Sequence, residues 1–193
     1  MCNTHSPFFT EDWFLSSLLN QHIDEMVNRY SCLLALRMDL FYQRDTDSFM
    51  QLDHCRLEYD IRSLMNEFGA LKASVGYFWV IEWTEKHGYH AHVVFWLDRQ
   101  KTQTTYPGFE WISKRWREIT NSNGGVHRCE YQEHYPADIN IPVRYDDSAS
   151  ILNIRRVLGY LAKEEQKKEL CEYSCNEVPP RPASGRPRQQ PII

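Results

Sequence analysis

The segment from Tyr77 to Asp98 (YFWVIEWTEKHGYHAHVVFWLD) constrains the fold more than any other part of the chain. Apolar and aromatic residues fill both halves of it, which is typical of strands that are buried on at least one face. Residues 84–88 between the halves are mainly polar and end in Gly88, which can adopt a positive φ at a tight turn. The segment therefore predicts two antiparallel strands joined by a short hairpin.

The pairing of this hairpin decides which side chains share a face of the sheet. If Trp83 pairs with Tyr89, then Glu82 lies opposite His90, and His92 follows two residues further along the same face. Two imidazoles and one carboxylate are a possible metal site with open coordination positions. Such a site suits Mg²⁺ or Mn²⁺ bound to a phosphate, and hydrolytic zinc is also chemically possible. The alternative is a pair of core or surface histidines without a metal.

The rest of the pattern predicts one α+β domain with a central antiparallel sheet of about five strands and helices packed on one side of it. Helical periodicity covers residues 10–30, 109–120, 147–170 and a stretch that begins at about 49 or 53 and ends at 68, and strand patterns cover 31–42 and 126–131. We expect residues 1–30 to be a lead-in with an amphipathic helix, 31–170 to be the main domain, and 171–193 to be a disordered tail rich in Pro and Arg.

Composition limits the functional classes only weakly. The chain has 193 residues, enough for one domain with a full-sized core, and a net charge of −4, which is no general signature of nucleic-acid binding. No apolar run approaches the roughly 18 residues of a membrane span, so we expect no membrane partner and a cytoplasmic location. The six cysteines are scattered, and Cys32 and Cys129 fall in apolar strand patterns, where cysteine behaves as a small buried hydrophobe.

Two further sets of charged residues have two interpretations each. Arg156, Tyr160, Lys163 and Lys167 recur at three- and four-residue steps in the last predicted helix and so share a face. A free tyrosine has a pKa near 10, so a nucleophilic role requires nearby cations, which these lysines supply. The alternative is an ordinary amphipathic helix with solvated lysines. Arg37 and Asp39 in the strand at 31–42 are either structural, as an internal ion pair or as sheet-surface residues, or a part of the active-centre surroundings.

Taken together, Glu82, the pair His90-Ala91-His92 and the downstream run 160–163 (YLAK) resemble the HUH endonucleases. These enzymes initiate rolling-circle replication of single-stranded DNA phages and plasmids. The segment IEWTEKHGYHAHVVFW is similar to the metal motif of phage replication proteins. Residues 31–168 as a whole resemble the prophage and inovirus replication-protein family, which is related to the gene-II-type proteins of filamentous phages.

The resemblance implies a role for each matching residue. His90, His92 and Glu82 would be the metal ligands, Tyr160 the nucleophile that forms a 5′-phosphotyrosyl bond, and Lys163 the lysine that positions the phosphate. The chain has one tyrosine at this motif, where some phage relatives have two.

The function expected from these features requires partners and leaves alternatives open. Single-stranded origin DNA would be the substrate, with Arg156 and Lys167 contacting its phosphates in a salt-dependent way. Because the sequence contains no helicase P-loop, unwinding would need a host helicase. A host polymerase would extend the free 3′-hydroxyl. Two alternatives remain open: a DNA-binding or regulatory protein that has lost nicking activity, and a metallohydrolase that uses water as its nucleophile.

Overall fold

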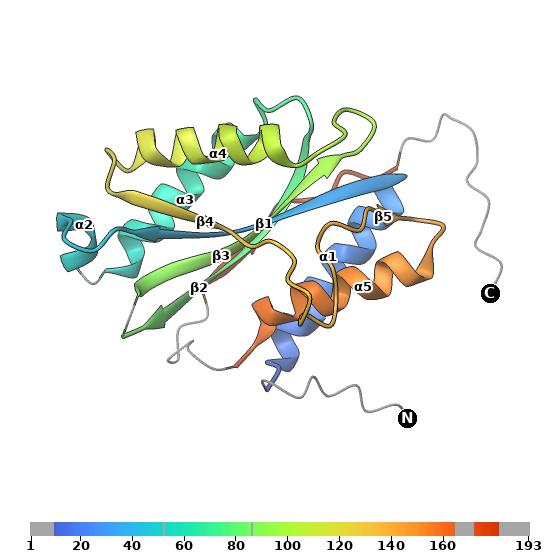
Figure 1. Cartoon of the computed structure of the whole chain (residues 1–193), viewed down its shortest axis with the longest axis horizontal. Helices are drawn as coiled ribbons and strands as arrows, with labels where there is room; N and C mark the ends of the chain where they lie inside the picture. The colour runs from blue at the N-terminus through green and yellow to red at the C-terminus, as the bar shows by residue number, and fades with distance from the viewer. Residues whose placement is uncertain (1–9, 52, 86, 165–171, 182–193) are drawn as a thin grey trace.

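The computed structural model describes residues 10–51, 53–85, 87–164 and 172–181. Its centre is an antiparallel sheet with the strand order β4-β1-β3-β2-β6, and β5 pairs with β1 beside this path (Figure 1). The strands are β1 (Cys32–Tyr42), β2 (Ser74–Thr84), β3 (Gly88–Asp98), β4 (Gly124–Arg128), β5 (Val143–Arg144) and β6 (Tyr173–Cys175). This architecture confirms the predicted α+β class and the central antiparallel sheet.

Helices cover both faces of the sheet, so the prediction that they lie on one side is wrong (Figure 1). Strand β1 shows the reason: its consecutive residues 33–36 are all buried, so each face carries apolar side chains that need cover. One face packs against α3 (His54–Phe68) and α4 (Tyr106–Ile119), and the other packs against α1 (Trp13–Arg29) and α5 (Ser148–Leu158).

Of the two starts predicted for the second helix, residues 49 and 53, the later one matches α3, and a separate short α2 (Asp47–Met50) precedes it. Helix α3 begins after Asp53, whose carboxylate accepts the backbone N–H of Cys55 at 2.9 Å and caps the new N-terminus. It ends at Phe68 before Gly69, as predicted. Helix α1 likewise begins after an aspartate, because Asp12 rather than Thr10 accepts the first free N–H groups.

The register of the β2–β3 hairpin is the one predicted from the sequence. Trp83 pairs with Tyr89 and Glu82 pairs with His90, and the glycine of the turn, Gly88, has a φ of 62°. His92 lies two residues beyond His90 on β3. All three candidate ligands therefore project from the face of the sheet that α1 and α5 cover.

The last predicted helix ends early. Helix α5 ends at Leu158, the residues Gly159–Ala162 form a 3₁₀ turn, and Lys163 is extended. The backbone then pairs with the N-terminal segment, because Asp12 N–H donates to Ala162 O and Glu164 N–H donates to Thr10 O, both at 2.7 Å. Residues 165–171, where the prediction continued the helix, lie outside the described residues.

Strand β6 occupies positions that the sequence analysis assigned to the C-terminal tail. It pairs with the outer edge of β2, with Tyr173 opposite Val80. The remaining parts of the predicted termini, residues 1–9 and 182–193, lie outside the described residues. Within the described part of the chain, none of the helices has the length and hydrophobicity needed to cross a membrane.

Candidate functional site

Glu82, His90 and His92 form a compact buried cluster on the α1/α5 face of the sheet. Each offers one ligand atom, and these atoms all lie within 4.8 Å of one another. The Glu82 side chain is fully buried, and the two histidines are 7% and 4% exposed. A carboxylate and two imidazoles at this spacing could hold a metal ion. The pairing of β2 with β3 creates the cluster, since it sets Glu82 beside residues that are eight and ten positions away.

Hydrogen bonds to the outer ring nitrogens orient both imidazoles. His90 Nδ1 donates to the carbonyl oxygen of Gly88 at 3.1 Å, and His92 Nδ1 donates to Asp39 Oδ1 at 2.5 Å. With Nδ1 as the donor, Nε2 of each ring is the nitrogen that remains for a ligand, which is the usual arrangement of metal-binding histidines. In His92 that Nε2 is hydrogen-bonded to Glu82 Oε2 at 3.1 Å, a bond that the nitrogen would give up to take a ligand.

The electrostatics of the cluster favour two ionised carboxylates. Burial raises the pKa of Glu82, but hydrogen bonds and charge interactions with His92 and Lys163 outweigh it and lower the pKa to about 2. Burial also raises the pKa of Asp39, yet its hydrogen bond with His92 holds the pKa of that carboxyl well below its usual range. In return, the two carboxylates raise the pKa of His92 against the opposing effect of burial, whereas burial lowers the pKa of His90. The result is an ionised carboxylate on each side of the His92 imidazole, with the Lys163 ammonium beside the buried one.

Tyr160 and Lys163 complete the cluster from the 3₁₀ turn that follows α5. Lys163 Nζ lies 2.8 Å from Glu82 Oε2 and donates to the Tyr160 hydroxyl at 2.5 Å. The Tyr160 ring stands edge-on to His92 with 5.2 Å between the centroids, and the Arg37 guanidinium lies 4.5 Å from the centre of the tyrosine ring. The tyrosine hydroxyl is thus linked to the buried carboxylate through a single ammonium group.

The way in which Tyr160 and Lys163 meet differs from the prediction. They do not share the face of one continuous helix, because Lys163 lies beyond the helical turn with extended backbone angles. Its side chain folds back over the tyrosine, with Nζ 3.8 Å from the ring centroid. Arg156 has an exposed side chain on α5, and Lys167 lies outside the described residues.

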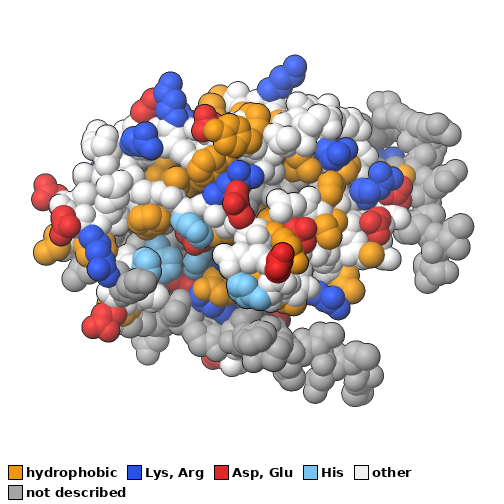
Figure 2. Space-filling model, in the orientation of Figure 1, with side chains coloured by type: hydrophobic (Ala, Val, Ile, Leu, Met, Phe, Trp, Pro, Cys, Tyr) orange, Lys and Arg blue, Asp and Glu red, His pale blue; other side chains and the backbone are white. Residues whose placement is uncertain are grey.

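Asp39 and Arg37 belong to the surroundings of this cluster, which decides between the two interpretations left open by the sequence. Asp39 is the cross-strand partner of His92 in the β1–β3 pairing, and it holds the imidazole in place. The signal in the sequence was the alternation along the strand, which places the two charged residues on the face opposite Leu36 and Met38. The pairing of β1 with β3 could not be read from the sequence. Figure 2 shows histidine side chains gathered on one face of the molecule, with acidic and basic side chains around them.

Comparison with models of protein families matches residues 39–169 to the replication-associated proteins of the ORF2 and gene-II type. The chain belongs to this family. The matched range begins at Asp39 and includes the hairpin, the 3₁₀ turn and Lys163. Membership of the family makes the chain a replication-associated protein and implies an interaction with DNA. Searches of curated proteins and of solved structures gave no significant match.

Proposed function

We propose that this replication-associated protein is a metal-dependent, site-specific endonuclease and strand transferase that initiates rolling-circle replication on single-stranded DNA. The observation that carries the proposal is the link from the Tyr160 hydroxyl through Lys163 to Glu82 in the buried His/Glu cluster. A nucleophile, a cation and a metal-binding donor set lie together on one face of the sheet. Family membership implies an interaction with DNA, which supports DNA as the substrate in this proposal.

The donor set fits a divalent ion. Glu82 is ionised and fully buried, so its carboxylate offers a negative charge to an ion, which would share that carboxylate with the Lys163 ammonium 2.8 Å away. Glu82, His90 and His92 would hold Mg²⁺ or Mn²⁺, because three protein ligands leave coordination positions for oxygen atoms of the DNA. When bound, such an ion polarises the scissile phosphate and neutralises the charge that develops on it.

The protein residues provide the nucleophile and the charge around it. The Tyr160 oxygen attacks the phosphorus and forms a new O–P bond, while the bond from phosphorus to the 3′ oxygen breaks and that oxygen leaves with the electron pair. The proton lost by the tyrosine is balanced by the one that the 3′ oxygen takes up. The Lys163 ammonium stabilises the phenolate during attack, and Arg37 over the ring contributes a second positive charge.

The products explain the use of a covalent intermediate. The 5′ end of the cut strand stays on Tyr160 as a phosphotyrosine, and the free 3′-hydroxyl can be extended by a host polymerase. Because the phosphotyrosyl bond retains the energy of the phosphodiester, attack by a second 3′-hydroxyl rejoins the DNA. Exposed Arg156 on α5 contacts the backbone of the bound strand, and Lys167 does the same in this proposal.

A covalent protein–DNA adduct tests the proposal. The full chain is incubated with Mn²⁺ and a pool of 3′-labelled single-stranded oligonucleotides that tile the DNA of the element carrying the gene, and adducts are detected on denaturing gels. We expect the wild-type protein to form an adduct that is lost in Tyr160→Phe and in Glu82→Gln. Tyr173→Phe, which changes another partly buried tyrosine, is the matched control and keeps the adduct.

Each other result contradicts a stated part of the proposal. Absence of an adduct from wild-type protein with both Mn²⁺ and Mg²⁺, together with DNA binding, indicates a binding or regulatory protein. Cleavage without an adduct indicates a hydrolase that uses water. An adduct that survives Tyr160→Phe refutes the assignment of the nucleophile.

A further inference from the structure

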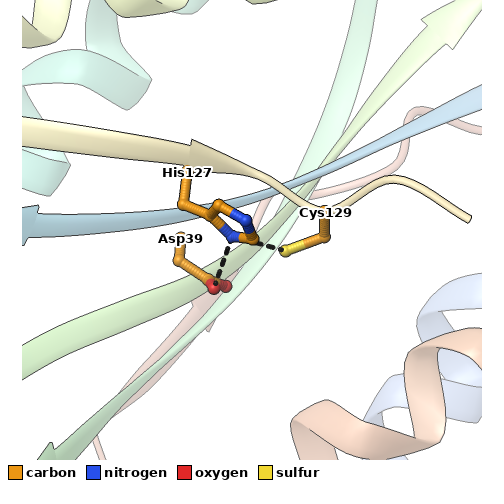
Figure 3. Close-up of side chains that lie close together, drawn as sticks. All are labelled: Asp39, His127 and Cys129. Atoms are coloured by element: carbon orange, nitrogen blue, oxygen red, sulfur yellow. Dashed lines mark hydrogen bonds and ion pairs between the residues drawn. The ribbon is translucent and has the colours of Figure 1, made fainter. Parts of the chain in front are cut away.

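A second cluster of metal-ligating side chains lies beside the first, at the junction of β1 and β4. It consists of Asp39, His127 and Cys129, whose ligand atoms lie within 4.8 Å of one another (Figure 3). His127 Nδ1 is 3.4 Å from Asp39 Oδ2 and 3.8 Å from Cys129 Sγ. Neither His127 nor Cys129 has a part in the proposed nicking reaction.

The strand register builds this cluster in the same way as the first. Asp39 pairs across strands with His127 on β4, as Glu82 pairs with His90 on β3, and the third member follows two residues later on the same face. The backbone continues the pairing past the end of β4, because Cys129 N–H donates to the carbonyl oxygen of Arg37 at 3.0 Å. The three side chains are therefore placed by paired backbone rather than by a flexible loop.

The distances suit a tetrahedral ion. Bonds of about 2.0 Å to nitrogen or oxygen and about 2.3 Å to sulfur place tetrahedral ligands about 3.3 Å apart for a nitrogen–oxygen pair and about 3.5 Å apart for a nitrogen–sulfur pair. The separations of 3.4 Å and 3.8 Å in the cluster are close to these values. Imidazole, carboxylate and thiolate are ligands of zinc, whereas Mg²⁺ prefers oxygen.

A third group of potential ligands among the described residues, Asp53, His54 and Cys55, lacks this support. Its members are consecutive in sequence at the start of α3, so their closeness follows from chain connectivity. The Asp53 carboxylate is engaged in capping the helix through the N–H of Cys55. The experiment below tests this group as the alternative metal site.

We propose that Asp39, His127 and Cys129 bind one thiophilic divalent ion, Zn²⁺, through Oδ2, Nδ1 and Sγ, with a fourth position open to water. This site is separate from that of Glu82, His90 and His92 and does not depend on the nicking reaction. Asp39 connects the two sites, because its Oδ1 hydrogen-bonds to His92 and its Oδ2 faces His127. An ion here fastens β4 to β1 and fixes the carboxylate that orients His92.

Cobalt spectroscopy distinguishes this site from its neighbours, because only a cysteine ligand gives a thiolate-to-Co²⁺ charge-transfer band. The full chain is stripped of metal with a chelator and titrated with Co²⁺, and Zn²⁺ is then added. In the wild-type protein we expect the band to reach its full intensity at one equivalent of Co²⁺ bound at this site. The band should disappear when Zn²⁺ displaces Co²⁺. The band should persist in Glu82→Gln, which removes a ligand of the other site, and in Cys55→Ser.

Cys129→Ser should abolish the band and His127→Ala should weaken Co²⁺ binding by at least tenfold, with circular dichroism confirming that each variant is folded. A wild-type protein without the band, or a folded Cys129→Ser protein that keeps it, overturns the proposal. Loss of the band in Cys55→Ser also overturns it and assigns the ion to the start of α3. Adduct formation with DNA does not enter the readout, so this proposal and the nicking proposal fail independently.

Discussion

Protonation of one buried histidine should make the stability of this protein fall on mild acidification. His22 on α1 is 3% exposed and packs against Phe78 and Trp96 at ring-centroid distances of 5.8 and 6.5 Å. Neither of its ring nitrogens has a hydrogen-bond partner among the described residues. We consider the substitution His22→Leu, which keeps an apolar side chain at this position of the helix.

Burial lowers the pKa of His22 from 6.5 to about 4, against a smaller raising effect of Glu25. Between these two values the unfolded chain binds a proton and the folded chain does not. The contribution of the neutral imidazole is therefore fully present above pH 6.5 and is lost as the pH falls toward 4. At about 1.4 kcal/mol for each pKa unit, the loss reaches about 3 kcal/mol at pH 4 and about 2 kcal/mol at pH 5.

Urea unfolding of both proteins at pH 7, 6 and 5, in buffer with a chelator, measures this effect. We expect His22→Leu to be more stable than wild type by about 1 kcal/mol at pH 7, because two unpartnered nitrogens are removed, and the gap to widen by about 2 kcal/mol at pH 5. His134→Leu, at an exposed position, should show no widening. A gap for His22→Leu that is constant with pH would refute the reasoning.

Three further predictions concern the site and the strand next to it. Asp39→Asn removes the carboxylate that holds His92, and we expect Mn²⁺ binding, measured by calorimetry, to weaken ten- to a hundredfold. Lys163→Met removes the ammonium that is paired with the buried Glu82 carboxylate, and we expect the free energy of unfolding without metal to fall by about 3 kcal/mol. Mn²⁺ should bind more tightly than in wild type, and adduct formation should decrease. Gly124→Ala places a Cβ against the indole nitrogen of Trp116, which packs on β4 from α4. We expect the free energy of unfolding, measured in urea, to fall by about 1–3 kcal/mol.

The candidate ligands could be predicted because they depend on one local hairpin. The turn glycine and the alternation on both strands determine the register that brings Glu82 to His90, and no contact with the rest of the chain is needed. Tyr160 was predicted as the candidate nucleophile from its neighbours in the sequence, although its position beside His92 depends on the packing of α5 against the sheet.

Features that depend on distant segments were missed. Helix α5 ends where the N-terminal segment offers hydrogen bonds to Ala162 and Glu164, and neither partner is visible in the helical periodicity. Strand β6 is only three residues long, too short for an alternating pattern. Cys129 was expected to be a small buried hydrophobe within a strand, but β4 ends at Arg128, and the thiol lies beside His127 instead.

The dependence of the candidate metal site on strand pairing has a consequence for folding. A slip of one residue in the β2–β3 register would move Glu82 to the opposite face from its two histidines. An ion bound by all three residues therefore stabilises only the correct pairing, and at a hundred times its dissociation constant it does so by about 2.7 kcal/mol. Divalent metal in the cell would then favour the correct strand register while the newly synthesised chain folds.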